Sequence, residues 1–179
     1  MGLLCLCVVC LAAISFVMPS LCPALGDLGI IVERMESKEG SIVDACKYCG
    51  KYVKVGHIHS DAEKIVKQKL QQALSERGFG YKDGKEQQPY ISVVIFRFQE
   101  RKGGNFAVDK PAGVGLHMHL IEGTIVGRTF VFDEDQQALS ENILGIGKFF
   151  RRGAKWITVE KLAEEGINKG TEYLLEILQ

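Results

Sequence analysis

Residues 90–98 read Tyr90-Ile91-Ser92-Val93-Val94-Ile95-Phe96-Arg97-Phe98, a stretch whose alternation is typical of a β-strand. Successive side chains of a strand point to opposite faces of its sheet. One face would carry Ile91, Val93 and Ile95, and the other Val94, Phe96 and Phe98. Because both faces are apolar, the stretch predicts a central strand that is covered by other elements.

Two further strands are predicted on the C-terminal side of this stretch. Residues 114–121 place Val114, Leu116, Met118 and Leu120 on one face, and Gly115, His117, His119 and Ile121 on the other. Glu122-Gly123-Thr124 is typical of a tight turn, after which residues 125–132 would pair back as a hairpin. Shorter strands are predicted at residues 30–32 and 51–55.

Helices are predicted on both sides of the strands. The sequence Ser60-Asp61-Ala62-Glu63 matches a capping box, residues 62–74 then repeat apolar positions at helical spacing, and Gly78 supplies a left-handed stop. Thr158 is expected to cap a C-terminal helix, and a shorter helix is predicted at residues 140–150. Gly166 and Gly170 lie on the apolar stripe of the last helix, which indicates a close approach to the sheet.

These elements predict an α+β fold, with a mixed or mainly antiparallel sheet and helices packed on one face. Residues 27–179 have the length of one ordinary domain. The chain carries 22 Lys and Arg against 22 Asp and Glu, so no net positive field favours nucleic acid as a partner.

The N-terminus is typical of an exported or membrane-anchored protein. No charged residue precedes Asp27, and residues 3–25 are almost wholly apolar. Met18-Pro19-Ser20 interrupts this run as a cleavage region would, so residues 1–26 are interpreted as a signal peptide or membrane anchor. Cys22 is the candidate for lipidation, although Leu21 before it is larger than a lipobox prefers and the first residues lack Lys or Arg.

A C-x-x-C pair, Cys46 and Cys49 followed by Gly50, precedes the histidine pair His57 and His59. Two thiolates can converge on a metal across a tight turn, and two imidazoles two residues apart on an extended segment point the same way. These four residues therefore predict a Cys2His2 metal site, with zinc as the candidate ion. The spacing differs from that of a standard zinc finger, so a Cys46–Cys49 disulfide or free thiols remain the alternative.

His117 and His119 form a second H-x-H pair and a possible second metal pair. Their place on the less apolar face of a strand is also typical of half-exposed histidines that bind nothing. If the sheet brought this pair to the first one, a bound copper or zinc ion would become plausible.

Two blocks carry a resemblance to a known family. The first runs from Phe98-Gln99-Glu100-Arg101-Lys102-Gly103-Gly104-Asn105-Phe106 to His117-Met118-His119, and the second from Phe132-Asp133-Glu134-Asp135-Gln136-Gln137 to Phe149-Phe150-Arg151-Arg152-Gly153. Together they resemble a group of uncharacterised lipoproteins of Gram-negative bacteria over roughly residues 27–179. The resemblance implies a cell-envelope location facing the periplasm, on the outer membrane, and it assigns no activity, because none is known for the group. It stops at the N-terminus, which lacks the charged first residues and the clean lipobox of such proteins.

Three functions follow in order of preference. The first is a membrane-tethered envelope module with a binding or structural role and a metal at Cys46, Cys49, His57 and His59. The second is an envelope assembly factor stapled by a disulfide, which only contacts another envelope protein. The third is an enzyme that hydrolyses its substrate with a metal-bound water. No serine elbow, carboxylate pair or nucleophile–base order is evident in the sequence, so no enzymatic activity is expected.

Overall fold

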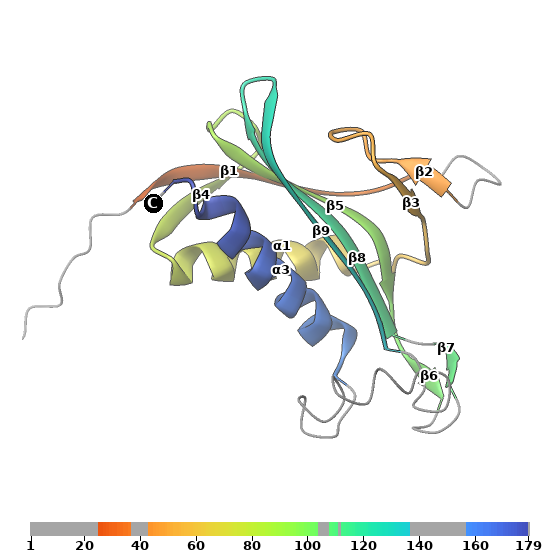
Figure 1. Ribbon diagram of the computed structural model, residues 1–179. Coiled ribbons are helices and arrows are strands. Elements are labelled where there is room, and N and C mark those ends of the chain that lie inside the picture. The colour runs from red at the N-terminus through yellow and green to blue at the C-terminus, as the bar shows by residue number, and fades with distance from the viewer. Residues whose placement is uncertain (1–24, 37–42, 104–107, 111, 137–156, 179) are drawn as a thin grey trace, which may run out of the picture.

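The computed structural model describes residues 25–36, 43–103, 108–110, 112–136 and 157–178 (Figure 1). Five strands form the main sheet in the order β4-β1-β5-β8-β9. Their bounds are β1 (Leu25–Arg34), β4 (Phe79–Asp83), β5 (Tyr90–Gln99), β8 (Ala112–Glu122) and β9 (Ile125–Gln136). β4 and β5 run parallel to β1, which lies between them, whereas β8 is antiparallel to both β5 and β9. The sheet is therefore mixed, and β5, which contains residues 90–98, is its central strand, as predicted.

Two helices, α1 (Ala62–Glu76) and α3 (Val159–Leu175), cover one face of the sheet, which confirms the predicted α+β fold (Figure 1). Between them and the sheet lies the larger hydrophobic core. From the helices it takes mainly Val66, Leu70, Leu74, Leu162, Ile167 and Leu174, and from the sheet mainly Ile91, Val93, Ile95, Leu116, Met118 and Phe132. This is the face that the sequence assigned to the alternating set beginning at Ile91. The assignment of Phe98 to the opposite face is wrong, because the register with β8 shifts between Ile95 and Arg97 and turns Phe98 into the larger core.

The opposite face of the sheet has a cover of its own. A short antiparallel hairpin, formed by β2 (Val43–Ala45) and β3 (Tyr52–Lys54), lies on the side away from the helices (Figure 1). We refer to residues 43–55 as the flap. A second, smaller core of Met35, Cys46, Val94 and Phe96 lies beneath it, with Tyr48, Cys49, Val53 and Val55 packed around. β6 (Lys102–Gly103) and β7 (Val108–Lys110) form a separate two-stranded sheet.

The helix ends agree with the sequence in two of three cases. Thr158 caps α3, because its hydroxyl oxygen accepts from the Lys161 N–H at 3.3 Å. Gly78 has φ +80° after α1, as predicted. The capping box from Ser60 is wrong, since Asp61 occupies the N-cap of α1 and makes no side-chain capping bond within the described chain. Glu63 instead accepts from the Arg34 guanidinium at 2.9 Å, which ties α1 to β1.

Some predictions fall outside the described residues. They are the helix at residues 140–150, the signal or anchor segment up to residue 24, and Cys22 within it. Within the described ranges, no helix combines the length and the apolar character that crossing a bilayer requires.

Gly166 shows why α3 carries glycine on its apolar stripe. A Cβ built there would lie 2.6 Å from the ring of Phe132 on β9, and one at Gly170 would overlap the Met118 sulfur of β8 and lie 2.9 Å from the ring of Phe130. Real carbon atoms do not approach so closely, so the helix rests on these two rings only because the side chains are missing. This confirms the close approach expected from the sequence.

Replacing Gly166 with Ala is predicted to lower the free energy of unfolding by roughly 1–2 kcal/mol, because overpacking outweighs the gain of about 1 kcal/mol in helix propensity. Urea unfolding measures the difference. Gly127→Ala on β9 is the matched control, since its added Cβ would meet no described atom nearer than 3.7 Å. A Gly166→Ala protein more stable than the parent would contradict close packing at this position.

Candidate metal centre

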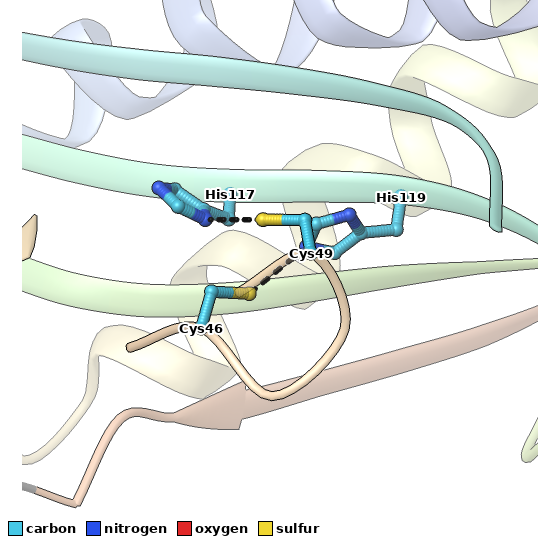
Figure 2. A group of neighbouring side chains, drawn as sticks. All are labelled: Cys46, Cys49, His117 and His119. Carbon is cyan, nitrogen blue, oxygen red and sulfur yellow. Dashed lines mark hydrogen bonds between the residues drawn. The ribbon is translucent and has the colours of Figure 1, made fainter. Parts of the chain in front are cut away.

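Four side chains meet between the flap and the sheet, namely Cys46, Cys49, His117 and His119 (Figure 2). Cys46 Sγ lies 3.2 Å from His119 Nε2, and Cys49 Sγ lies 3.5 Å from His117 Nδ1. One donor atom from each of the four lies within 4.8 Å of all the others. Thiolate sulfur and imidazole nitrogen are the donors that zinc prefers in tetrahedral protein sites.

The two histidines owe their position to the alternation of β8. His117 lies opposite Val94 and His119 opposite Ser92 in the β5–β8 ladder, so both point to the face that the flap covers. Both are fully buried, with no exposed side-chain surface. The interpretation as half-exposed histidines is therefore wrong, and the reason is the flap, which closes over a strand face that would otherwise be open.

The two cysteines are brought to this face by a tight turn between β2 and β3. The Gly50 N–H donates to the Cys46 carbonyl at 2.7 Å, and the Cys46 N–H donates to the Lys51 carbonyl at 2.9 Å. Gly50 has φ +68°, a conformation that favours glycine, as the sequence predicted for the residue after the second thiol. The turn directs both sulfur atoms toward the histidines, and neither forms a disulfide within the described chain (Figure 2).

His119 is oriented by a neighbour on β9. Its Nδ1 lies 3.1 Å from the Thr129 hydroxyl, and Thr129 stands directly opposite it in the β8–β9 ladder. A proton on Nδ1, donated to the Thr129 oxygen, leaves the Nε2 lone pair directed toward Cys46 Sγ. Metal-binding histidines are commonly held in this way by a second hydrogen bond.

His117 is held by packing. The ring of Phe96 meets it edge-on, with centroids 5.2 Å apart. A Cβ at Gly115 would overlap the Phe96 ring, so the glycine gives Phe96 its place. With Nδ1 facing Cys49, the remaining Nε2 is buried and has no hydrogen-bond partner among the described residues. Such a group costs about 1–3 kcal/mol, which a gain at Nδ1 would have to offset.

Burial controls the protonation of the cluster. It lowers the pKa of His117 to about 4, with a smaller contribution from the charge of Lys51. It lowers the pKa of His119 to about 4 as well, helped by His117 and Lys51. Burial also raises the pKa of the Cys46 thiol. At neutral pH both imidazoles are therefore uncharged and ready to coordinate, whereas binding a metal would release the proton of Cys46.

The first histidine pair lies elsewhere. His57 and His59 are exposed, and neither belongs to the cluster. Their backbone bonds with Phe98 hold the segment along β5, and Ile58 between them packs against the larger core. The alternation that aligns the two histidines thus turns them away from the interior, and the predicted ligand set of Cys46, Cys49, His57 and His59 is not assembled.

The geometry of the cluster fits a metal ion of the size of zinc. With Zn–S of about 2.3 Å and Zn–N of about 2.0–2.1 Å, tetrahedral donors lie about 3.3–3.8 Å apart. The two S–N separations of 3.2 and 3.5 Å are close to this range. All four donors lie within 4.8 Å of one another, so the most distant of them would have to approach by up to about 1 Å to take up an ion.

Comparison with known proteins defines the class of the fold. The sequence matches no protein-family model and no curated protein. Its structure is similar to that of PelC from Paraburkholderia phytofirmans, a dodecamer, with a TM-score of 0.51 and 13% identity over 90% of this chain and 93% of that one. The chain thus shares the PelC fold.

Two other solved structures are more distant. A Xanthomonas campestris protein of the family DUF330 has a TM-score of 0.41 and 11% identity over 86% of this chain and 81% of its own. A minor lipoprotein from Acinetobacter baumannii has a TM-score of 0.34 and 8% identity over 80% of this chain and 90% of its own. At these scores neither adds to the assignment of the fold.

Without metal, the protein is predicted to lose stability as the pH falls from 7.5 to 5.5. The folded pKa of His117 and His119 is about 4, below the ordinary 6.5, so the unfolded chain binds more protons in this window. Above pH 6.5 both states are neutral and the effect vanishes. At pH 5.5 each histidine costs roughly 1 kcal/mol of unfolding free energy.

Urea unfolding with chelator and reductant at both pH values tests this prediction. His57→Gln/His59→Gln is the matched control. Both sites are exposed, so this variant should lose as much unfolding free energy between pH 7.5 and 5.5 as the parent does. Equal stability at pH 7.5 and 5.5 would contradict the buried, neutral state of the second pair.

Proposed function

We propose that this protein is a membrane-tethered module of the cell envelope, with a binding or structural role, and that its flap is fastened by one zinc ion. The observation that carries the proposal is the meeting of Cys46, Cys49, His117 and His119 at one point. The ligands join the flap to β8, so the ion would connect two parts of the chain about 70 residues apart.

Zinc here would act as a staple. The hairpin of the flap has only three residues in each strand, and an isolated two-stranded hairpin is marginally stable at best. The smaller core supplies few apolar residues to hold it. Four coordinate bonds to residues of the flap and the sheet would provide what packing does not, as metals do in small domains.

The donor set argues against a catalytic role. Catalytic zinc sites keep one position open for water or substrate, whereas structural sites fill all four positions with protein ligands. The described cluster offers four protein donors, three of them in buried residues. We therefore propose no enzymatic activity for this site.

The tether is the N-terminal segment, whose residues 3–25 are almost wholly apolar. Either as an anchor or through a lipid on Cys22, it would hold the domain at the periplasmic face of a membrane, which we propose to be the outer one. PelC, which shares the fold, assembles as a dodecamer. This favours a protein, rather than a small molecule or nucleic acid, as the partner of this chain, and we propose that the partner is another envelope protein.

The metal is tested by its stoichiometry. We expect about one zinc per chain in protein purified without chelator, because tetrahedral Cys2His2 sites hold a single ion. Cys46→Ser and His119→Gln should each abolish it, whereas His57→Gln/His59→Gln should retain it. Elemental analysis of the full chain in detergent, with a free-thiol count, gives the answer.

Two results of the zinc analysis would contradict the proposal. Loss of zinc in the His57→Gln/His59→Gln protein alone would move the site to the exposed pair and contradict the proposal. If protein purified from the periplasm contains neither zinc nor free thiols at Cys46 and Cys49, the two cysteines form a disulfide and the zinc proposal is contradicted.

If the ion fastens the flap, its removal should also speed hydrogen exchange of residues 43–55 without changing that of β8.

Thr129 gives a finer test of the geometry. Thr129→Val keeps the shape but removes the acceptor for His119 Nδ1, so we expect zinc affinity to fall by about 10-fold, the lower end of the effect of such supporting bonds. Competition with a chromophoric chelator measures the change. Thr124→Val in the exposed β8–β9 turn is the control and should bind as the parent does. An unchanged affinity in Thr129→Val would show that the hydrogen bond does not orient the ligand.

A further inference from the structure

An apolar patch lies where the last turn of the chain meets the β8–β9 hairpin. Ile125 and Ile177 are 71% and 54% exposed, although both are large aliphatic residues. They line a cavity of about 160 Å³, whose other walls are Pro89, Leu120, Glu122, Gly127 and Leu178. We refer to this surface as the terminal patch.

The terminal patch is fixed in shape by Arg128 of β9. Its guanidinium donates to the Tyr173 carbonyl at 2.5 Å and to the Glu176 carboxylate at 2.9 Å, and it stacks over the Tyr173 ring at 4.6 Å. These contacts hold the end of α3 against the sheet, so the two isoleucines stay side by side. They also pair the cation with the acid of Glu176, so that the carboxylate of Glu122 is the remaining charge among the residues that line the cavity.

The N-terminal segment enters the fold near this patch. The Gly29 N–H donates to the Pro89 carbonyl at 3.0 Å, and Pro89 lines the cavity. β1 begins at Leu25, four residues before Gly29, which is about 13 Å of extended chain. Cys22 precedes Leu25 by three residues, or at most about 10 Å. A tether through this segment therefore brings this end of the sheet against the bilayer.

We infer that the terminal patch is the surface with which the tethered protein rests on the lipid bilayer, Ile125 and Ile177 entering the interface between headgroups and acyl chains. This inference rests on the membrane tether of the proposed function. Two isoleucines are too few to hold a free domain on a membrane, but a tether makes the contact intramolecular and needs only weak affinity to fix one orientation. The carboxylate of Glu122 at the edge of the patch would be repelled by anionic headgroups, so zwitterionic lipid fits the patch better.

The orientation has a consequence for the flap. Figure 1 places β2 and β3 well away from the start of β1. With the terminal patch on the bilayer, the flap and its metal centre would face the aqueous space, where a protein partner can reach them.

Tryptophan reporters test the orientation in the full chain. Ile125→Trp and Ile177→Trp are reconstituted in phosphatidylcholine vesicles with or without bromine on the acyl chains, and Tyr52→Trp on β3, 76% exposed in the parent, is the matched control. The signal of Trp156 in the parent is subtracted. We expect bromine to reduce the added emission about two-fold at positions 125 and 177, as for side chains within the interface, and to leave position 52 unchanged.

The other outcomes overturn the inference in distinguishable ways. A chain that floats with the vesicles but shows equal quenching at 52 and 125 keeps its tether and lacks the orientation. Emission from position 125 that is shifted to the blue but insensitive to bromine would assign the terminal patch to a second copy of the chain. A chain that does not float at all would remove the tether, and both proposals about the membrane would fall together.

Discussion

The rest of the structure depends on one constraint, which is that β5 is apolar on both faces. A sheet built around such a strand needs two covers. α1 and α3 form the first, with a core that spans the whole sheet. Among the described residues the flap forms the second, and its small core has four buried members, Met35, Cys46, Val94 and Phe96. Cys46 belongs both to this core and to the Cys–His cluster, so the residues that cover the second face of β5 also form the candidate metal centre.

The same constraint explains the burial of the histidines. His117 and His119 alternate with Leu116, Met118 and Leu120 along β8, and whichever face the helices take, the histidines receive the other. A polar ring enclosed there must find partners, because burial without hydrogen bonds is costly. The thiols of the flap provide them at 3.2 and 3.5 Å. Thr129 provides another from β9.

Much of the fold could be predicted from the sequence because its signals are local. Alternation in residues 90–98 and 114–121, the turn at Gly123, the Thr158 cap and the glycines of α3 all act within one element or its nearest contact. The ligand set could not be predicted, since Cys46 and His119 are 73 residues apart and only the fold of the flap joins them. Sequence proximity favoured His57 and His59, and the alternation around Ile58 turned both outward. The pairing of Thr129 with His119 could have been predicted from the sequence, because the turn at Gly123 sets the hairpin register that places the two residues opposite each other.

A Cys46–Cys49 disulfide and a metal-bound pair of thiolates would affect the buried histidines differently. A disulfide between Cys46 and Cys49 would consume both thiol protons, and neither sulfur could then donate to the imidazoles. His119 would keep Thr129, but His117 would have two buried nitrogens and no partner among the described residues, where Nε2 already has none. Each such group costs about 1–3 kcal/mol. A metal ion does the opposite, since it would bind His117 Nδ1, His119 Nε2 and both sulfurs at once, and it would leave only His117 Nε2 without a partner among the described residues. The burial of the second pair is therefore itself an argument against the disulfide and for the reduced thiols that a metal ion requires, independent of the spacing of the cysteines.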